Sequence, residues 1–263
     1  MANNITLWTY LQQQPPALPI SPPAHPSRNT TNKSYSFQDI RQPGHWDAFN
    51  LQEIVQRYGT LLHGALIEHN PMPTSPPSAV GGELALTSRI HTYFKDRIRR
   101  AIRSGITHAR AVHQIAGLTV LEFDVGDMAA TIENYRPDLA YFDPTRPYNT
   151  GPNRLPGDIK PSWKWHMGLQ NSPLNTAREE FRQALSQVNY YMNQHHSRYG
   201  FILTDRELVA IRKQDTHGNL DLSDPIPWRT VGDGQAPILT LPLALWYLGM
   251  LAAQDQGPER WNM

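Results

Sequence analysis

Cysteine is absent from the 263 residues of this chain. Its absence excludes disulfide bonds, cysteine-ligated zinc, iron–sulfur clusters and thiol nucleophiles. It also agrees with a reducing compartment, because disulfides persist mainly in oxidising ones. We therefore expect an intracellular protein of the cytoplasm or nucleus.

Long apolar runs are missing as well, and none reaches the roughly 18 residues that a membrane-spanning helix needs. Residues 1–10 lack the basic start and apolar centre of a secretory signal. The glycine motifs of ATP-binding loops, Rossmann dinucleotide sites and serine-hydrolase elbows are also absent, so those chemistries have no support. We expect a soluble chain without a membrane partner, and the sequence leaves its oligomeric state open.

An excess of charge of either sign is also missing, because the formal net charge is +1. A neutral total does not favour strong nonspecific binding to nucleic acid, although local patches can still act. Hydrophobic residues make up 39% of the chain, which also has 23 prolines. Proline clusters in 14–34, so we interpret 1–46 as a flexible arm and 47–263 as one α/β domain.

The periodicity of apolar residues predicts an α/β fold, in which helices cover both faces of a mixed central sheet. Helices are expected from Asp47, which can cap the first, and at 83–104, about 175–196 and 238–253. Gly105 is a natural stop for the second helix, and Leu84 is expected on its buried face. Strands are expected at 118–125, 138–142, from 157 onward, 201–204 and 208–211, with an extended segment at 225–228.

Two acidic residues and a lysine fall on neighbouring predicted strands. Asp158 and Lys160 are two positions apart, so their side chains share one face of the third strand. Asp138 begins the preceding strand and can reach the same place. Two carboxylates this close repel unless a cation holds them, and Mg²⁺ or Mn²⁺ suits such oxygen ligands. A structural Asp–Lys ion pair at a strand edge is the alternative interpretation.

These residues resemble the PD-(D/E)xK nuclease superfamily, particularly its RecB-like branch. Pro137-Asp138 matches the P-D of that family, and Asp158-Ile159-Lys160 matches its (D/E)-x-K. The resemblance implies a restriction-endonuclease-like αβββαβ core over about 83–213. It also implies Asp138 and Asp158 as metal ligands, Lys160 as the catalytic cation, and Mg²⁺ or Mn²⁺ as the cofactor.

Further residues are assigned supporting roles by the same resemblance. Glu83 would be the acidic residue of the first helix, while Gln187 and Tyr191 match the Q-x-x-x-Y of the helix after the third strand. Gln187 and Tyr191 are four apart and share a helical face, where ordinary packing of Tyr191 is the alternative. The stretch 199–208 additionally resembles proteins of filamentous fungi, a likeness that implies no activity.

Aromatic and basic side chains near these motifs are candidates for substrate binding. Trp163 and Lys164 follow the third strand, where aromatic rings beside cations can stack on bases or simply cover the sheet edge. Arg99 and Arg103 belong to a basic helix surface, with Lys95, Arg97 and Arg100, that either contacts phosphates or faces solvent. The histidines His166, His195 and His196 are interpreted as surface or capping residues.

Three functions remain open on the sequence alone. The first is a divalent-metal-dependent phosphodiester hydrolase that acts on nucleic acid, either DNA or RNA, with tRNA among the candidates. The second is a fungal biosynthetic enzyme on a nuclease-like fold, such as a tRNA-dependent arginine-containing cyclodipeptide synthase, although the adjacent acidic pair associated with that class is missing. The third is a non-catalytic module that binds nucleic acid or protein.

Overall fold

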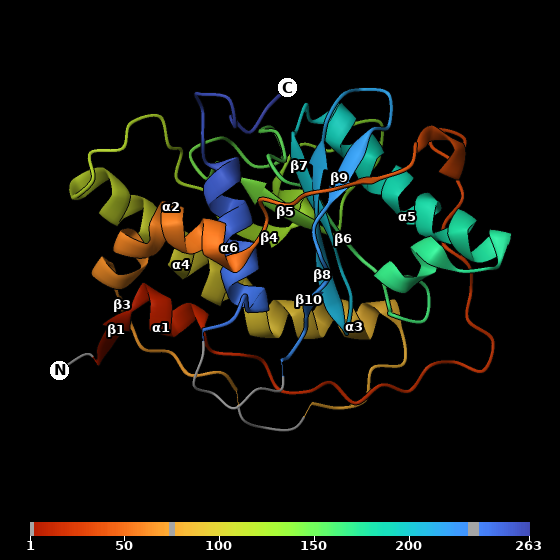
Figure 1. Cartoon of the computed structure of the whole chain (residues 1–263), viewed down its shortest axis with the longest axis horizontal. Coiled ribbons are helices and arrows are strands. Elements are labelled where there is room, and N and C mark those ends of the chain that lie inside the picture. The colour runs from red at the N-terminus through yellow and green to blue at the C-terminus, as the bar shows by residue number, and fades with distance from the viewer. Residues whose placement is uncertain (1–2, 74–76, 231–236) are drawn as a thin grey trace.

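The computed structural model describes residues 3–73, 77–230 and 237–263, and its centre is a mixed 8-stranded sheet (Figure 1). The main path of strands has the order β2-β9-β8-β7-β6-β5-β4, and β10 pairs with β8 beside it. The strands of this sheet are β2 (Gly44–His45), β4 (Glu122–Val125), β5 (Leu139–Phe142), β6 (Gly157–Ile159), β7 (Tyr199–Leu203), β8 (Glu207–Lys213), β9 (Leu220–Leu222) and β10 (Ile226–Pro227).

The helices alternate with these strands in the order predicted from the sequence. The main helices are α2 (Leu51–Gly64), α3 (Glu83–Ile90), α4 (Asp96–Ala111), α5 (Asn175–Gln194) and α6 (Leu241–Ala252). β4, β5 and β6 are antiparallel neighbours, whereas β6 and β7 are parallel. Parallel neighbours need a crossover, and α5 provides it. Helix, three strands, helix and strand therefore follow one another from Glu83 to Leu203.

Hydrophobic side chains cover both faces of the sheet, as expected for this fold class. Phe201 and Leu203 of β7 belong to the larger core, which includes residues of α4 and α6. Ile202, between them, belongs to a second core that includes Val209 and the α5 residue Phe181. This alternation follows from the period of two along a strand. It confirms the α/β class, with a mixed sheet between helices.

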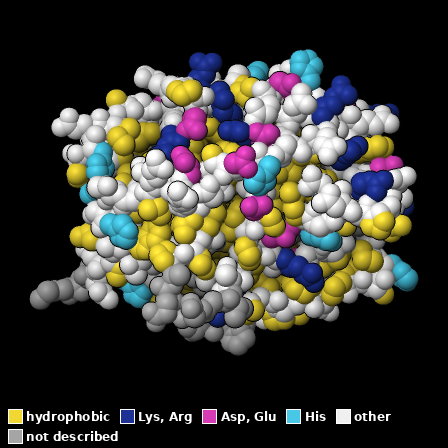
Figure 2. Space-filling model, in the orientation of Figure 1, with side chains coloured by type: hydrophobic (Ala, Val, Ile, Leu, Met, Phe, Trp, Pro, Cys, Tyr) yellow, Lys and Arg dark blue, Asp and Glu magenta, His cyan; other side chains and the backbone are white. Residues whose placement is uncertain are grey.

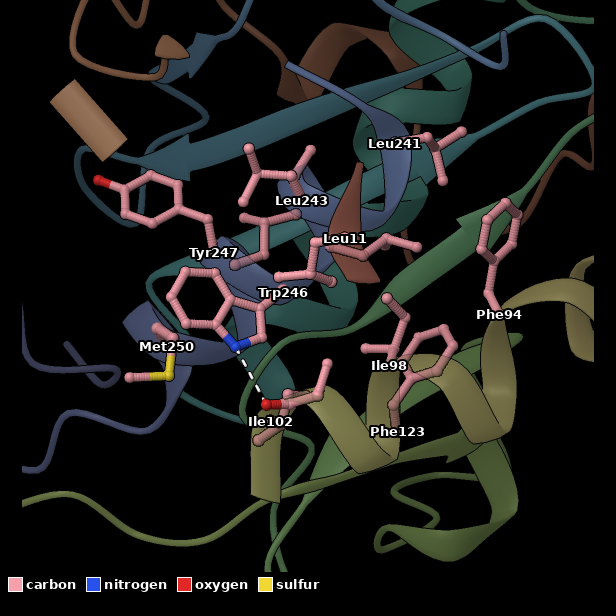
Figure 3. Packing of buried hydrophobic residues seen from close by; sticks show 14 of the residues in the cluster. Leu11, Phe94, Ile98, Ile102, Phe123, Leu241, Leu243, Trp246, Tyr247 and Met250 are labelled. Atoms are coloured by element: carbon pink, nitrogen blue, oxygen red, sulfur yellow. Dashed lines mark hydrogen bonds between the residues drawn. The ribbon is translucent and has the colours of Figure 1, made fainter. Parts of the chain in front are cut away.

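The larger core is centred on the contact between α4 and α6 (Figure 3). All residues of α6 are buried, which fits a helix that is apolar all round. Trp246 of α6 packs near Ile102 of α4, and its indole Nε1 donates to the carbonyl oxygen of Ala101 at 3.2 Å. In the described part of the chain, no helix combines the length and apolarity required to cross a membrane.

Three predicted details of the helices are wrong. The helix expected to stop at Gly105 continues from α3 through a π-helical turn, η2 (His91–Lys95), and α4 to Ala111. Gly105 lies inside α4 and does not end it. A Cβ at this position would be only 2.9 Å from Trp246 Nε1, so the close packing of Trp246 explains the glycine. Leu84 is 85% exposed rather than buried. Asn50, not Asp47, caps α2 by accepting from the Glu53 N–H at 2.9 Å.

The first predicted strand is shorter than expected. The alternating residues 118–125 form a strand only over β4, and Leu118 makes a single bridge to Gln254 instead. The Leu118 carbonyl oxygen accepts a hydrogen bond from the Arg110 guanidinium, while Thr119 N–H donates to the Ala253 carbonyl at 2.8 Å. These contacts beyond the sheet use the backbone groups that a longer ladder would need.

The N-terminal segment, residues 3–46, lies against the rest of the chain along most of its length (Figure 1). β1 (Asn4–Thr6) pairs with β3 (Leu66–Glu68), and α1 (Leu7–Leu11) buries Leu7, Tyr10 and Leu11 in the larger core. After the proline-rich stretch, the short helix η1 (Phe37–Asp39) packs beside α5, where the Phe37 N–H donates to Gln183 Oε1 at 3.0 Å. The flexibility expected of an arm stays a prediction.

Candidate functional site

Asp138, Asp158 and Lys160 lie together at one end of the β5–β6 pair. Asp158 is the middle residue of β6, and Lys160 follows that strand with its Nζ 2.5 Å from Asp158 Oδ2. Asp138 immediately precedes β5, and its Oδ2 accepts from the Ile159 N–H at 2.7 Å. The spacing of two along the strand thus produces the contact that it predicted.

Two glycines allow the backbone to bring these residues together. A Cβ at Gly157 would be 2.1 Å from Cζ of Phe201, so only glycine lets β6 pass over that ring. A Cβ at Gly126 would be 1.7 Å from the Pro137 carbonyl oxygen, and the Gly126 N–H donates to the Asp138 carbonyl at 3.1 Å. Close backbone approach at both glycines therefore fixes Asp138 beside Asp158.

The two carboxyl groups strongly affect each other. Asp158 is 1% exposed, and burial raises its pKa against the opposing charge of Lys160. Burial and then the charge of Asp158 raise the pKa of Asp138 to about 7, although Lys160 and the Ile159 N–H oppose this shift. The Asp138 carboxyl is also close enough to hydrogen-bond to Asp158 when one of them is protonated. Two acids in such contact favour a shared proton or a shared cation.

Lys160 keeps its positive charge in this environment. It is 4% exposed, and burial alone would lower its pKa. The carboxylates of Asp158, Asp138 and Glu83 outweigh that effect and raise the pKa above its ordinary value. Asp158 Oδ2 has no described partner in hydrogen-bond geometry, so the contact with Lys160 is an ion pair without hydrogen-bond alignment.

Glu83, Trp163 and Lys164 come together next to this centre. Glu83 begins α3, and its Oε2 accepts from Lys164 Nζ at 3.1 Å. Together with the half-buried Trp163, both residues line a hollow of about 130 Å³. The charge of Glu83 helps to raise the pKa values of Asp138 and Asp158, so Glu83 is near enough to act on both carboxyl groups. The neighbouring Trp165 is fully buried and stacks on Phe181.

Gln187 and Tyr191 face the same centre from α5. Gln187 Nε2 donates to the Tyr191 hydroxyl at 3.0 Å, as a spacing of four on a helix allows. Burial, followed by the charge of Asp158, raises the pKa of Tyr191 well above its ordinary value. Gln187 Oε1 is buried and has no partner among the described residues. The predicted helix face is therefore directed at Asp158.

Arg99 and Arg103 lie apart from this centre. Arg103 pairs with Glu122, which is opposite Phe142 at the far end of the β4–β5 pair from Asp138. Arg99 Nη2 is 2.9 Å from Asp96 Oδ1 on α4. Their roles in substrate binding stay predictions.

One residue predicted to belong to the basic surface of this helix is buried instead. Arg97 is only 4% exposed and donates to the carbonyl oxygens of Tyr10 and Asn70, so it belongs to the interior.

A cluster of tyrosines borders the centre and was missed by the sequence analysis. The rings of Tyr35 and Tyr190 have centroids 5.6 Å apart, and those of Tyr135 and Tyr190 are 5.0 Å apart. Tyr35 is close enough to Asp158 for that carboxylate, after burial, to help raise its pKa to about 12. Tyr135 directly precedes Arg136-Pro137-Asp138, and Tyr190 precedes Tyr191, so their positions offered a signal. Tyr35 offered none, because it lies in the segment interpreted as an arm.

Asp138 and Asp158 are the residues of this centre that could hold a divalent cation. Among residues 3–73, 77–230 and 237–263, no three histidine or acidic side chains form a metal-binding group. Two carboxylates are nevertheless sufficient for Mg²⁺, which commonly uses one or two protein ligands with water and substrate phosphate. Asp138 and Asp158 could supply them, although Asp158 Oδ2 already forms an ion pair with Lys160 Nζ at 2.5 Å. Comparison with known protein families, curated proteins and solved structures found no match to this chain.

Proposed function

We propose that this protein is a divalent-metal-dependent phosphodiester hydrolase that acts on nucleic acid. The observation that carries the proposal is the contact of Asp138, Asp158 and Lys160 on adjoining strands, with α3 and α4 before them and α5 after them. Two neighbouring carboxyl groups, each with a pKa raised chiefly by burial, lie beside a permanent cation, and this arrangement suits metal-assisted attack on a phosphate.

Asp138 and Asp158 would hold the metal. A bound Mg²⁺ or Mn²⁺ can acidify a water molecule and polarise a phosphoryl oxygen. Asp138 is the more accessible of the two acids, being half-buried, and would face the substrate. Its backbone-anchored Oδ2 fixes the orientation of the carboxylate through the Ile159 N–H.

Lys160 would stabilise the negative charge that develops on the phosphate. Its raised pKa keeps the amine protonated at neutral pH, which excludes Lys160 as the base. Held beside Asp158, the ammonium is already oriented before substrate arrives, so little reorganisation is needed. Gln187 and Tyr191 support this arrangement from α5.

Charge on the surface favours selective rather than nonspecific binding. Figure 2 shows basic and acidic side chains interspersed over the face in view. Mixed charge gives little long-range attraction for a polyanion, so recognition has to come from contacts close to the centre.

Calorimetric titration with Mn²⁺ tests the proposal directly. We expect the wild-type protein to bind Mn²⁺ and to cleave labelled DNA, RNA or tRNA, and Asp158→Asn to lose both properties. Lys160→Met is expected to retain Mn²⁺ binding but to lose about 10²- to 10³-fold in cleavage rate, as when a stabiliser of developing charge is removed.

Asp96→Asn is the matched control, because Asp96 is an exposed acid on α4 that pairs with Arg99. It should leave both metal binding and cleavage unchanged. Absence of Mn²⁺ binding in the folded wild-type protein, together with no cleavage of any of the three substrates, would contradict the proposal.

A non-catalytic binding module is the second candidate, and one observation favours it. The Asp158–Lys160 pair is nearly inaccessible to solvent, as a structural ion pair would be. Nucleic-acid binding that is equally tight in Asp158→Asn and in EDTA, without cleavage by the wild type, would select this function.

A further inference from the structure

A polar cavity of about 390 Å³ lies next to the candidate site, between the N-terminal segment, α5 and the turn from β8 to β9. Tyr35 and Asp39 come from the N-terminal segment, Asn189 and Tyr190 from α5, and His217 from the turn. Its volume is within the range of about 300–1,000 Å³ that is common for small-molecule sites. Neither the sequence motifs nor the proposed metal centre uses this cavity.

Asn189 gives the cavity an unused hydrogen-bonding group. The residue is 5% exposed, and its Oδ1 has no partner among the residues that the structure describes. A buried amide without a partner is unfavourable, so a ligand that hydrogen-bonds to it is favoured. Rotation of the amide by half a turn exchanges its donor and acceptor ends, which lets it pair with either kind of group.

Two tyrosines give the same cavity an aromatic wall. Tyr35 is 4% exposed and Tyr190 is partly exposed, and their ring planes are inclined by 42°. The Tyr190 hydroxyl donates to Glu133 Oε2 at 2.6 Å, which holds this ring in place. A ring fixed at the edge of a cavity is a surface on which a planar group can stack.

Charges around the cavity disfavour an anion as its occupant. Asp39 lines it together with Arg41, so groups of both signs are present. Among the residues that the structure describes, the carboxylate of Asp39 accepts one hydrogen bond, from the Ser36 N–H at 2.7 Å. A neutral, planar group with polar edges fits the amide, the aromatic rings and the mixed charge together.

Tyr35 and α5 connect the cavity to the metal centre. Tyr35 lines the cavity and is also close enough to Asp158 to respond to its charge. Tyr190, which also lines the cavity, has its ring centroid 5.0 Å from that of Tyr135, and Tyr135 is only three residues before Asp138. The cavity is therefore close to the centre, which makes it a candidate for a neighbouring part of the same ligand.

We propose that the cavity receives one unpaired nucleobase of the strand whose phosphate lies at Asp138, Asp158 and Lys160. Asn189 would hydrogen-bond to the edge of the base, and Tyr190 would stack on its face. This inference rests on the proposed function and specifies its substrate as single-stranded or locally opened nucleic acid. An intact duplex would bind more weakly, because a base must first leave its stack.

Binding measured in EDTA tests the inference without turnover. The probe is a single strand of about 12 nucleotides with 2-aminopurine at one position, compared with the matching duplex. We expect the single strand to bind more tightly than the duplex. We also expect the 2-aminopurine emission to change on binding when the label is at one particular position in the strand. Asn189→Leu and Tyr190→Ala should each weaken binding by about 5- to 150-fold, the range expected for one stacked or paired base. Asn171→Leu, an exposed amide outside the cavity, is the matched control.

The outcomes separate this inference from the proposed hydrolase function. The cavity assignment is overturned if folded Asn189→Leu and Tyr190→Ala bind the single strand as tightly as the wild type does. It is also overturned if the protein prefers the duplex. Both conclusions hold even if Mn²⁺-dependent cleavage is observed. Conversely, a protein without Mn²⁺ binding or cleavage fails as a hydrolase. If that protein still shows the expected loss in both variants, the base-binding role of the cavity is supported.

Discussion

Buried charge at Asp138, Asp158 and Lys160 is costly for the fold. Two acids and one lysine leave one negative charge unbalanced when all three are ionised, and removing one partner of a buried pair typically costs about 3–5 kcal/mol. A structure that keeps such a group without need for it would be unusual, because apolar replacements are often neutral or stabilising. Buried charge that is costly to stability is typical of a functional centre.

His195 provides a pH-dependent test at the scale of one residue. It caps α5 but is 2% exposed, so the expectation of a surface histidine is wrong while that of a capping histidine is confirmed. Its Nδ1 accepts the Asn153 N–H at 3.2 Å, and its buried Nε2 has no described partner. Burial, followed by His196, lowers the pKa of His195 from 6.5 to about 4.

The lowered pKa means that the unfolded chain binds the proton more readily than the folded one. The contribution of His195 to the free energy of unfolding is therefore complete above pH 6.5 and is lost as the pH falls from 6.5 toward 4. At about 1.4 kcal/mol for each pKa unit, the loss is at most about 3 kcal/mol. We expect denaturant unfolding between pH 7 and pH 4 to show this loss in the wild type.

His195→Asn is the matched variant, because its side-chain oxygen can still accept the Asn153 N–H. Its free energy of unfolding should decrease less over the same pH range. Parallel pH profiles for the two proteins would contradict a buried neutral histidine.

The packing of α4 on α6 provides a test at the scale of elements. Gly105→Ala places a Cβ 2.9 Å from Trp246 Nε1 and 3.1 Å from its Cζ2, and this indole is fully buried. Overpacking of this kind costs about 1–3 kcal/mol, which exceeds the gain of about 1 kcal/mol from replacing a helical glycine. Thermal unfolding should therefore show a lower midpoint for Gly105→Ala.

Gly59→Ala is the control on α2. The nearest atom to its Cβ outside the helix backbone is Val55 Cγ1 at 3.4 Å, so the helical preference of alanine should dominate. We expect a gain of about 0.5–1 kcal/mol there. Equal gains at both glycines would show that α6 does not press against α4 at Gly105.

Predictions from local sequence pattern agree with the structure where strand or helix geometry alone decides which side chains meet. The contact of Asp158 with Lys160 and that of Gln187 with Tyr191 follow from spacings of two and four, which depend only on strand and helix geometry. The stop predicted at Gly105 failed because the glycine serves a contact with α6, 141 positions away. No local signal contains a tertiary contact of that length.

The N-terminal segment shows the same limit for the candidate site. A proline-rich composition predicts little burial, yet Tyr35 is 4% exposed beside Asp158. Its burial depends on neighbours such as Tyr190, with which it has no proximity in sequence. The contact of Asp158 with Lys160 was thus predictable, whereas the place of Tyr35 beside them was not.

α1 tests how the whole molecule depends on its N-terminal residues. Leu11 is fully buried in the larger core, and Leu→Ala changes at such positions cost about 2–5 kcal/mol. We expect Leu11→Ala to reduce the free energy of unfolding by about 3 kcal/mol in urea. Leu84→Ala, at a residue 85% exposed, should change it by less than about 0.5 kcal/mol. Similar small effects for both would show that α1 is not part of the cooperative unit.

The contacts of α1 also determine when folding can finish. The Leu11 carbonyl oxygen accepts from Thr240 Oγ1 at 2.6 Å, and Gln12 Nε2 donates to the Ile238 carbonyl at 3.0 Å. These partners are separated by 229 and 226 positions. At about 5–20 residues per second, a ribosome needs roughly 10–50 s to synthesise the intervening chain. During that time α1 can contact β3, α2 and α4 but lacks these two partners and α6, so chaperone binding to the nascent chain should continue until α6 emerges.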